Sequence, residues 1–204
     1  MDKIDFKKTL RHLYRPSKKF EIVDVPEMQF IMVDGHGDPN QAQEYADAVE
    51  ALYAVAYKMK FMSKKQLEKD YTVPPLEGLW WAEDMDTYQT RDKSAWDWTM
   101  MIMTPDWITQ ELFAAAVAEV RKKKNPASLD KVRFETYHEG QSVQIMHLGS
   151  YDNEAPTIAA MHNVFIPENG LTENGKHHEI YLSDPRRVPP EKLKTVLRQP
   201  AKAK

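Results

Sequence analysis

The sequence predicts an α+β fold, with one antiparallel sheet made of two tandem, pseudo-symmetric β-α-β-β modules. Two observations predict it. Apolar residues recur at steps of three and four within 41–62, as on one face of an amphipathic helix, and short apolar strands flank this segment. A similar order of strand, helix and strands recurs after residue 130. We therefore expect helices on one face of the sheet and a ligand cleft on the other.

One domain is expected to contain all 204 residues, since a chain of this length can bury one good core. Its expected parts are a first module at 20–105, a linking helix within 106–130 and a second module at 131–200.

The first module is expected to begin with a hairpin, in which Phe20 to Val25 turns through Pro26 and returns at Met28. The remaining expected elements are a strand at 30–34, the helix at 41–62, a strand at 76–81, an acidic hairpin at 84–92 and a strand at 96–103.

The linking helix is expected at 108–124, with Asp106 as its N-cap. The second module then opens with an expected hairpin that turns at Gly140 into the next strand. Its later elements are that strand at 143–148, a helix at 154–165, a strand at 177–182 and a final segment at 194–198.

Charge and cysteine content argue against several functions. The net charge is -3 and the chain has no cysteine, so we expect neither a nucleic-acid partner nor a thiol nucleophile. No apolar segment is long enough to span a membrane, and no signal peptide opens the chain, so we expect no membrane partner and a cytoplasmic location. Without glycine-rich nucleotide loops or a Gly-x-Ser-x-Gly elbow, we also expect no cofactor.

The segment from His177 to Arg187 is the most informative one for function. In an extended strand residues i and i+2 share a face, so Glu179 and Tyr181 point one way while Ile180 points the other. A carboxylate beside a phenol suits binding or chemistry better than packing, which makes Glu179 and Tyr181 the predicted catalytic pair. The alternative for Glu179 is a solvent-facing or ion-paired strand residue.

Metal binding is not expected from this segment. His177, His178 and Glu179 are direct neighbours, so they alternate between the two faces of a strand, and no His-Glu-x-x-His spacing accompanies them.

Aromatic residues supply the expected walls of a ligand site. Aligning the two modules makes Trp81 equivalent to Tyr181, and Trp98 lies on the adjacent expected strand. His147 and Tyr53 are further substrate-binding candidates, with core packing as the alternative for Tyr53. A hydrophobic aromatic small molecule is therefore the expected partner.

Three segments together resemble the GyrI-like small-molecule-binding proteins, in particular members of about this length that stand alone. They are Pro75 to Trp81, Val143 to Asp152 and His177 to Arg187, within a resemblance that extends from about Phe20 to Arg198. The resemblance implies a tandem pair of β-α-β-β modules and a ligand cavity that contains Glu179.

The resemblance also implies a function. Some stand-alone relatives hydrolyse the strained cyclopropane ring of DNA-alkylating natural products. In that reaction Glu179 would activate a water molecule, and Tyr181 would orient it or donate to the developing oxyanion. Two alternatives stay open: a non-catalytic binder or sensor of hydrophobic or cationic drugs, and an interaction protein that antagonises gyrase inhibitors. Spare strand edges are compatible with a homodimer.

Overall fold

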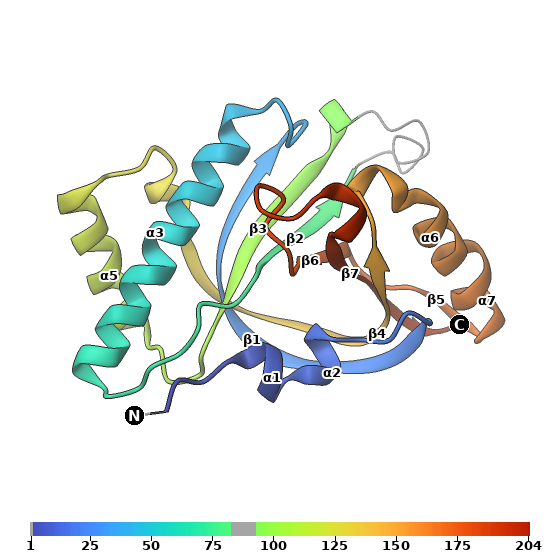
Figure 1. Cartoon of the computed structure of the whole chain (residues 1–204), viewed down its shortest axis with the longest axis horizontal. Coiled ribbons are helices and arrows are strands. Elements are labelled where there is room, and N and C mark those ends of the chain that lie inside the picture. The colour runs from blue at the N-terminus through green and yellow to red at the C-terminus, as the bar shows by residue number, and fades with distance from the viewer. Residues whose placement is uncertain (1, 83–92) are drawn as a thin grey trace. The chain divides into compact units, whose positions relative to one another are not determined.

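The computed structural model describes residues 2–82 and 93–204, so the expected acidic hairpin at 84–92 lies outside the described residues (Figure 1). It has a mixed α+β fold. The elements, in chain order, are α1 (Phe6–Thr9), α2 (Arg11–Tyr14), β1 (Glu21–His36), α3 (Gln43–Gln66), β2 (Leu76–Trp81), β3 (Asp97–Thr104), α5 (Gln110–Lys123), β4 (Arg133–Leu148), α6 (Ala155–Ala160), a π-helical turn (Met161–Phe165), α7 (Ile166–Glu168), β5 (Leu171–Glu173), β6 (His177–Tyr181) and β7 (Lys194–Ala203).

Two compact units divide the chain. Unit 1 comprises Met1–Thr9, Met28–Pro74 and Gly78–Tyr137, whereas unit 2 comprises Leu10–Glu27, Pro75–Glu77 and His138–Lys204. The strands β1, β2 and β4 each begin in one unit and end in the other.

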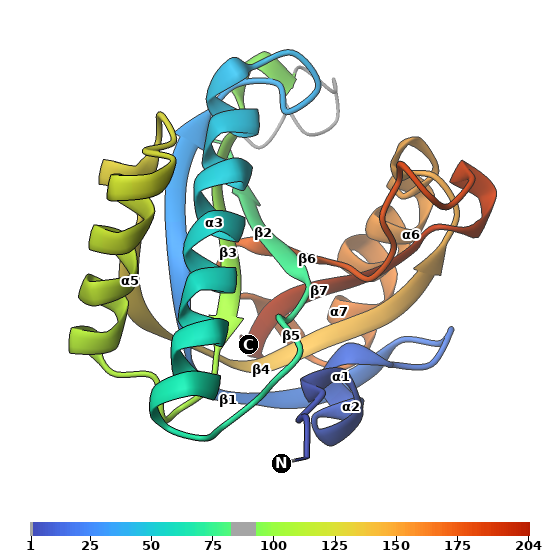
Figure 2. The same cartoon turned by 60° about the vertical axis from the view of Figure 1, so that its left-hand side comes forward.

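In unit 1 the strand order is β4-β1-β3-β2, and β1 pairs with β3 in antiparallel register. Helix α3 packs on β3, and α5 lies beside α3 (Figure 2). The buried residues Ala48, Leu52, Val55 and Met59 follow one another along α3 at steps of three and four. This spacing gives the helix one apolar stripe, which anchors it in the unit.

In unit 2 the strand β7 pairs in antiparallel register with β4, β6 and β5. Directly paired residues point to the same face, so Ile145, Leu197 and Glu179 form a row across three strands. Ile145 and Leu197 belong to the apolar core of this unit, together with Met161 and Ile166 from the helical stretch 155–168. That stretch therefore covers the face that carries Glu179.

Two segments expected to form hairpins are continuous strands. β1 runs through Pro26 and β4 runs through Gly140, each for 16 residues. A strand can contain a single proline at an edge, or a single glycine where it bends. Gly140 has a positive φ of 70°, a conformation that glycine adopts easily. Those two turn predictions were wrong, because local turn propensity yielded to strand pairing.

The N-cap of α5 also differs from the prediction. Thr109 caps the helix, and its Oγ1 accepts a hydrogen bond from the backbone N–H of Leu112 at 3.3 Å. The helix thus begins later than expected, so Asp106 lies before its first turn.

Candidate functional site

Glu179 and Tyr181 lie on the same face of β6, as the strand alternation predicts. The Tyr181 hydroxyl donates a hydrogen bond to Glu179 Oε2 at 2.7 Å. The Glu179 side chain is 15% exposed, so most of the carboxylate is shielded from solvent while part of it stays accessible. A shielded carboxylate held in one orientation by a phenol is suited to general-base chemistry.

The face that carries this pair differs from our expectation. We expected the ligand cleft on the face opposite the helices. In unit 2, however, Glu179 and Leu197 are paired residues, and Leu197 packs in the core with Met161 of the helical stretch. Glu179 and Tyr181 therefore lie on the helix-covered face of this unit.

Tyr151 lies beside Tyr181 on this face. Their rings are 5.7 Å apart and nearly perpendicular, at 81°. Burial, together with the nearby negative charges of Glu154, Glu179 and Asp184, raises the pKa of Tyr151 to about 12. These three carboxylates make the electrostatic potential around the two tyrosines negative.

His177 is the residue of this face that our reasoning from the sequence missed. Its Nε2 lies 3.4 Å from Glu179 Oε1, at ion-pair distance but without hydrogen-bond alignment. The period-two alternation that joins Glu179 to Tyr181 also places His177 on their face. The sequence therefore contained a signal for His177. No local pattern pointed to His162, although its ring centroid lies 6.2 Å from that of His177.

The opposite face of β6 carries a buried network of charges centred on His178. Its Nδ1 lies 3.0 Å from Glu139 Oε1, and its Nε2 lies 2.9 Å from Glu77 Oε2. Arg198 donates from Nη1 to Glu139 at 3.1 Å, and the Tyr14 hydroxyl donates to Glu77 at 3.0 Å. All five side chains belong to unit 2 and are buried.

The network fixes the protonation of its members. Burial opposes a charge on His178, but Glu139 and Glu77 outweigh it and raise the pKa of His178 from 6.5 to about 9. Burial likewise opposes ionisation of Glu139, yet His178 and Arg198 lower the pKa of Glu139 to about 2. The His178 imidazolium donates to the carboxylates of Glu77 and Glu139 and so holds one face of β6 in place. This also fixes the position of Glu179 on the opposite face of the strand.

His147 lies on the face of Glu179 and Tyr181. It is paired with Thr195, which is in turn paired with Tyr181, so the three side chains form a row. His147 is 8% exposed, and its Nε2 lies 3.3 Å from the carbonyl oxygen of Ser150. Of the predicted substrate-binding residues, His147 is the one that shares unit 2 with the glutamate.

The other predicted ligand walls belong to unit 1. Trp98 is completely buried, because its ring lies across Gly35 of the paired strand and packs edge-on against Tyr45 of α3. Its indole packs inside unit 1 in this structure, and its role as a ligand wall stays a prediction. Trp81, at the end of β2, is half-buried.

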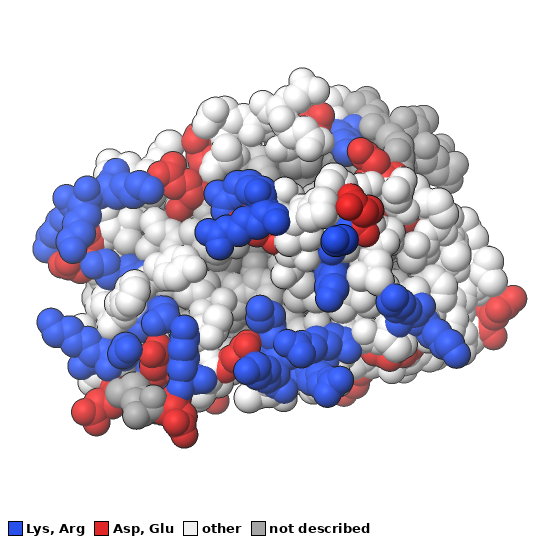
Figure 3. Space-filling view, in the orientation of Figure 1, with Lys and Arg blue, Asp and Glu red and all other residues white. Residues whose placement is uncertain are grey.

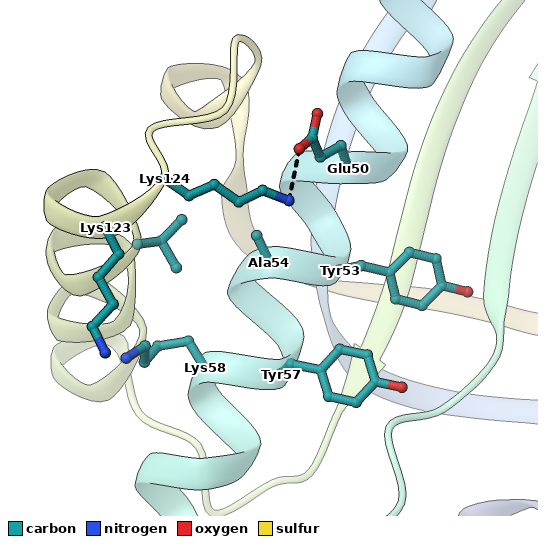
Figure 4. Close-up of a pocket in the computed structure, with 8 residues that line it drawn as sticks. Glu50, Tyr53, Ala54, Tyr57, Lys58, Lys123 and Lys124 are labelled. Carbon is teal, nitrogen blue, oxygen red and sulfur yellow. Dashed lines mark ion pairs between the residues drawn. The ribbon is translucent and has the colours of Figure 1, made fainter.

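Tyr53 lines a groove of about 400 Å³ between α3 and α5 (Figure 4). Figure 4 shows Tyr53 and Tyr57 side by side on α3, directed away from α5. The lysines around the groove are largely engaged: Lys124 pairs with Glu50 at 2.8 Å, and Lys58 lies 4.0 Å from Glu119. This groove has few buried polar groups and is a weaker candidate for chemistry than β6.

Two further features of the described residues concern metal ligands and membrane-spanning helices. Within 2–82 and 93–204, no three His, Asp or Glu side chains are arranged to hold a metal ion. Among the helices of the same residues, none is both long and apolar enough to cross a membrane. On the face seen in Figure 3, the Lys and Arg side chains form several separate groups with acidic side chains among them.

Comparisons with known proteins agree with a ligand-binding role. A model of the GyrI-like small molecule binding domain matches residues 18–202. A crystal structure of an uncharacterized conserved protein from Listeria innocua is similar, with 46% identity, a TM-score of 0.90 and coverage of 98% of this chain and 100% of that chain. Two structures of a hydrolase from Listeria innocua show 44% identity at the same coverage, with TM-scores of 0.86 and 0.89. No curated protein matches the chain.

Proposed function

The chain belongs to the GyrI-like small-molecule-binding family, and from this premise we propose that it is a hydrolase that adds water to ring-strained, partly aromatic electrophiles. The observation that carries the proposal is the shielded Glu179 carboxylate, held at 2.7 Å by the Tyr181 hydroxyl. The similarity to hydrolases from Listeria innocua, at 44% identity over 98% of the chain, supports it.

The proposed reaction opens a cyclopropane conjugated to a carbonyl group. Glu179 takes a proton from a water molecule while the water oxygen forms a bond to a ring carbon. The strained C–C bond breaks, and its electron pair moves to the carbonyl oxygen, which becomes an oxyanion and is then protonated. Tyr181 orients the Glu179 carboxylate or the water, or donates to the oxyanion. The net change is the addition of one water molecule.

The aromatic neighbours of Glu179 favour a second candidate function. Three carboxylates lie near Tyr151, whose ring contacts that of Tyr181, and their negative charge helps to raise the pKa of Tyr151. Electron-rich rings beside acidic groups attract cations. The alternative is therefore capture or sensing of a cationic aromatic drug, with Glu179 as a counter-charge.

The proposal also includes the two pseudo-symmetric modules and the cytoplasmic location that the sequence predicts. The order β1-α3-β2-β3 precedes α5, and β4, the helical stretch 155–168, the short β5, β6 and β7 follow it. Apart from β5 the two orders agree, which supports pseudo-symmetric modules at 20–105 and 131–200 around a ligand cleft. We also propose a cytoplasmic location, where such a protein would meet electrophiles that have entered the cell.

Mass spectrometry with a spirocyclopropyl cyclohexadienone as the probe tests the reaction. The wild type should release the ring-opened product, heavier by one water, over many turnovers. Replacing a general base typically costs 10²- to 10⁴-fold in rate, so Glu179→Gln should lower kcat by roughly 100-fold or more while the probe still binds. Glu168→Gln, at an exposed glutamate of α7, is the matched control and should retain the wild-type kcat.

Two results would contradict the proposal. Release of unchanged probe by the wild type would establish binding without catalysis. A Glu179→Gln variant with the wild-type kcat would remove Glu179 from the reaction.

A further inference from the structure

We infer that His177, His162 and Glu173 form a proton path that links Glu179 to solvent. This inference rests on the proposed function, because it assigns the route by which Glu179 loses the proton that it takes from water. All four residues belong to unit 2.

The path begins at His177, two residues before Glu179 on the same face of β6. Its Nε2 lies 3.4 Å from Glu179 Oε1, and its side chain is only 5% exposed. In the described part of the chain neither ring nitrogen of His177 has a hydrogen-bond partner. Buried polar groups are nearly always hydrogen-bonded, so this imidazole lacks the contacts of a core histidine. Both of its nitrogens are available to pass a proton.

The second residue of the path, His162, lies in the π-helical turn that interrupts the helical stretch 155–168. Such turns are rare and occur frequently at functional sites. The His162 and His177 ring centroids are 6.2 Å apart, a separation that a single bridging water can span. His162 Nε2 is buried and, within the described residues, also lacks a hydrogen-bond partner.

Glu173, on β5, ends the path at the surface. Its Oε1 lies 2.6 Å from His162 Nδ1, so a proton on Nδ1 leaves Nε2 as an acceptor. The hydrogen bond from His162 lowers the pKa of Glu173 and outweighs its partial burial. Side-chain exposure is 5% at His177, 17% at His162 and 42% at Glu173. Exposure therefore rises step by step from His177 to Glu173.

The chemistry of the path is a sequence of proton transfers without oxidation or reduction. After ring opening, Glu179 carries the proton taken from water. His177 accepts that proton at one ring nitrogen and releases one from the other, through water, to His162. His162 passes a proton to Glu173 and bulk solvent, and solvent supplies the proton that neutralises the product oxyanion. Glu179 is then ready for the next water molecule.

Kinetics of His177→Gln, with the cyclopropane probe used above, tests the path. Loss of the path should lower kcat by roughly tenfold or more and leave KM nearly unchanged, because His177 transfers a proton and does not hold the substrate. Added imidazole should restore much of the lost rate, since it can carry the proton instead. His162→Gln should show the same pattern more weakly. His138→Gln, at an exposed histidine of β4, is the control and should behave as wild type.

The outcomes separate the path from the proposed function. A wild type without turnover would overturn both. Turnover that Glu179→Gln abolishes and His177→Gln leaves intact would overturn the path alone. A reduced rate that imidazole does not restore would also overturn it, because it indicates a structural role. If His177→Gln does not fold, Glu173→Gln at the exposed end decides by the same criteria.

Discussion

His178 determines the charge balance of the buried network in unit 2. Glu77 and Glu139 contribute two negative charges, Arg198 contributes one positive charge, and protonated His178 makes the sum zero. Deprotonating His178 would leave one buried negative charge without compensation, which is costly in a site shielded from water. The folded state therefore holds this proton more tightly than the unfolded chain does.

This difference predicts a stability that falls at alkaline pH. The pKa of His178 is raised from 6.5 to about 9, so the folded state binds more protons than the unfolded chain in this interval. The contribution of His178 to the free energy of unfolding is complete below pH 6.5 and is lost as the pH rises through about 9. Urea unfolding measured at several pH values should show this decline.

Two variants identify the source of the decline. His178→Asn should flatten the profile between pH 6.5 and 9, whereas His36→Gln, at an exposed histidine of unit 1, should leave it unchanged. A wild-type profile that is already flat in this interval would contradict the assignment.

At acid pH the dependence has the opposite sign, because the pKa of Glu139 is lowered from 4.5 to about 2. The contribution of Glu139 to the free energy of unfolding is present above pH 4.5 and is lost as the pH falls towards 2.

At the scale of elements, the pairing of β1 with β3 depends on a glycine that accommodates a tryptophan. Gly35 is paired with Trp98, and a Cβ at Gly35 would lie 2.0 Å from Cη2 of the indole. Trp98 Nε1 also donates to the carbonyl oxygen of Gly37 at 3.2 Å, which helps to hold the ring in place. The ring fills the space that a side chain on β1 would otherwise occupy.

Gly35→Ala should therefore destabilise the fold by about 1–3 kcal/mol or more, since overpacking forces the ring or the strand to move. Chemical denaturation measures the change. The control is the double variant Gly35→Ala/Trp98→Leu. Its loss should be smaller than the sum of the two single losses, because the leucine leaves room for the new methyl group. Strictly additive losses would show that the two residues do not interact in this way.

The elements that the sequence predicts well are those with a strong period. The helix expected at 41–62 is present as Gln43–Gln66, and the face shared by Glu179 and Tyr181 follows from strand alternation. The hairpins expected at Pro26 and Gly140 failed because turn signals act locally, whereas pairing with distant strands decides whether a segment stays extended.

The candidate site was predictable only in part for a related reason. Glu179, Tyr181 and His177 are close together on one strand, so a short segment of sequence is enough to predict that they share a face. His162 and Glu173 reach this strand through the π-helical turn and the pairing of β5 with β7. Neither contact has a signature in a local pattern.

At the scale of the whole molecule, unit 2 is assembled from three separated segments of the chain. Leu10–Glu27 and Pro75–Glu77 supply partners to the buried charges of His138–Lys204. Arg198 donates to the Leu13 carbonyl oxygen at 2.7 Å, and Gln144 donates to the His12 carbonyl oxygen at 2.7 Å. Folding of this unit thus requires chain regions on both sides of the linking helix.

A fragment of residues 131–204 should therefore lack a fixed tertiary structure when expressed alone. The fragment lacks Glu77 and the Tyr14 that donates to it, so the buried His178 loses one of its two carboxylate partners. Unpaired buried charges typically cost several kcal/mol. Two-dimensional NMR should show poorly dispersed amide signals for this fragment. Coexpression of 1–125 with 126–204, split in the loop after α5, supplies the missing segments and should restore dispersion. A fragment 131–204 that unfolds cooperatively by itself would show that the second module is an autonomous folding unit.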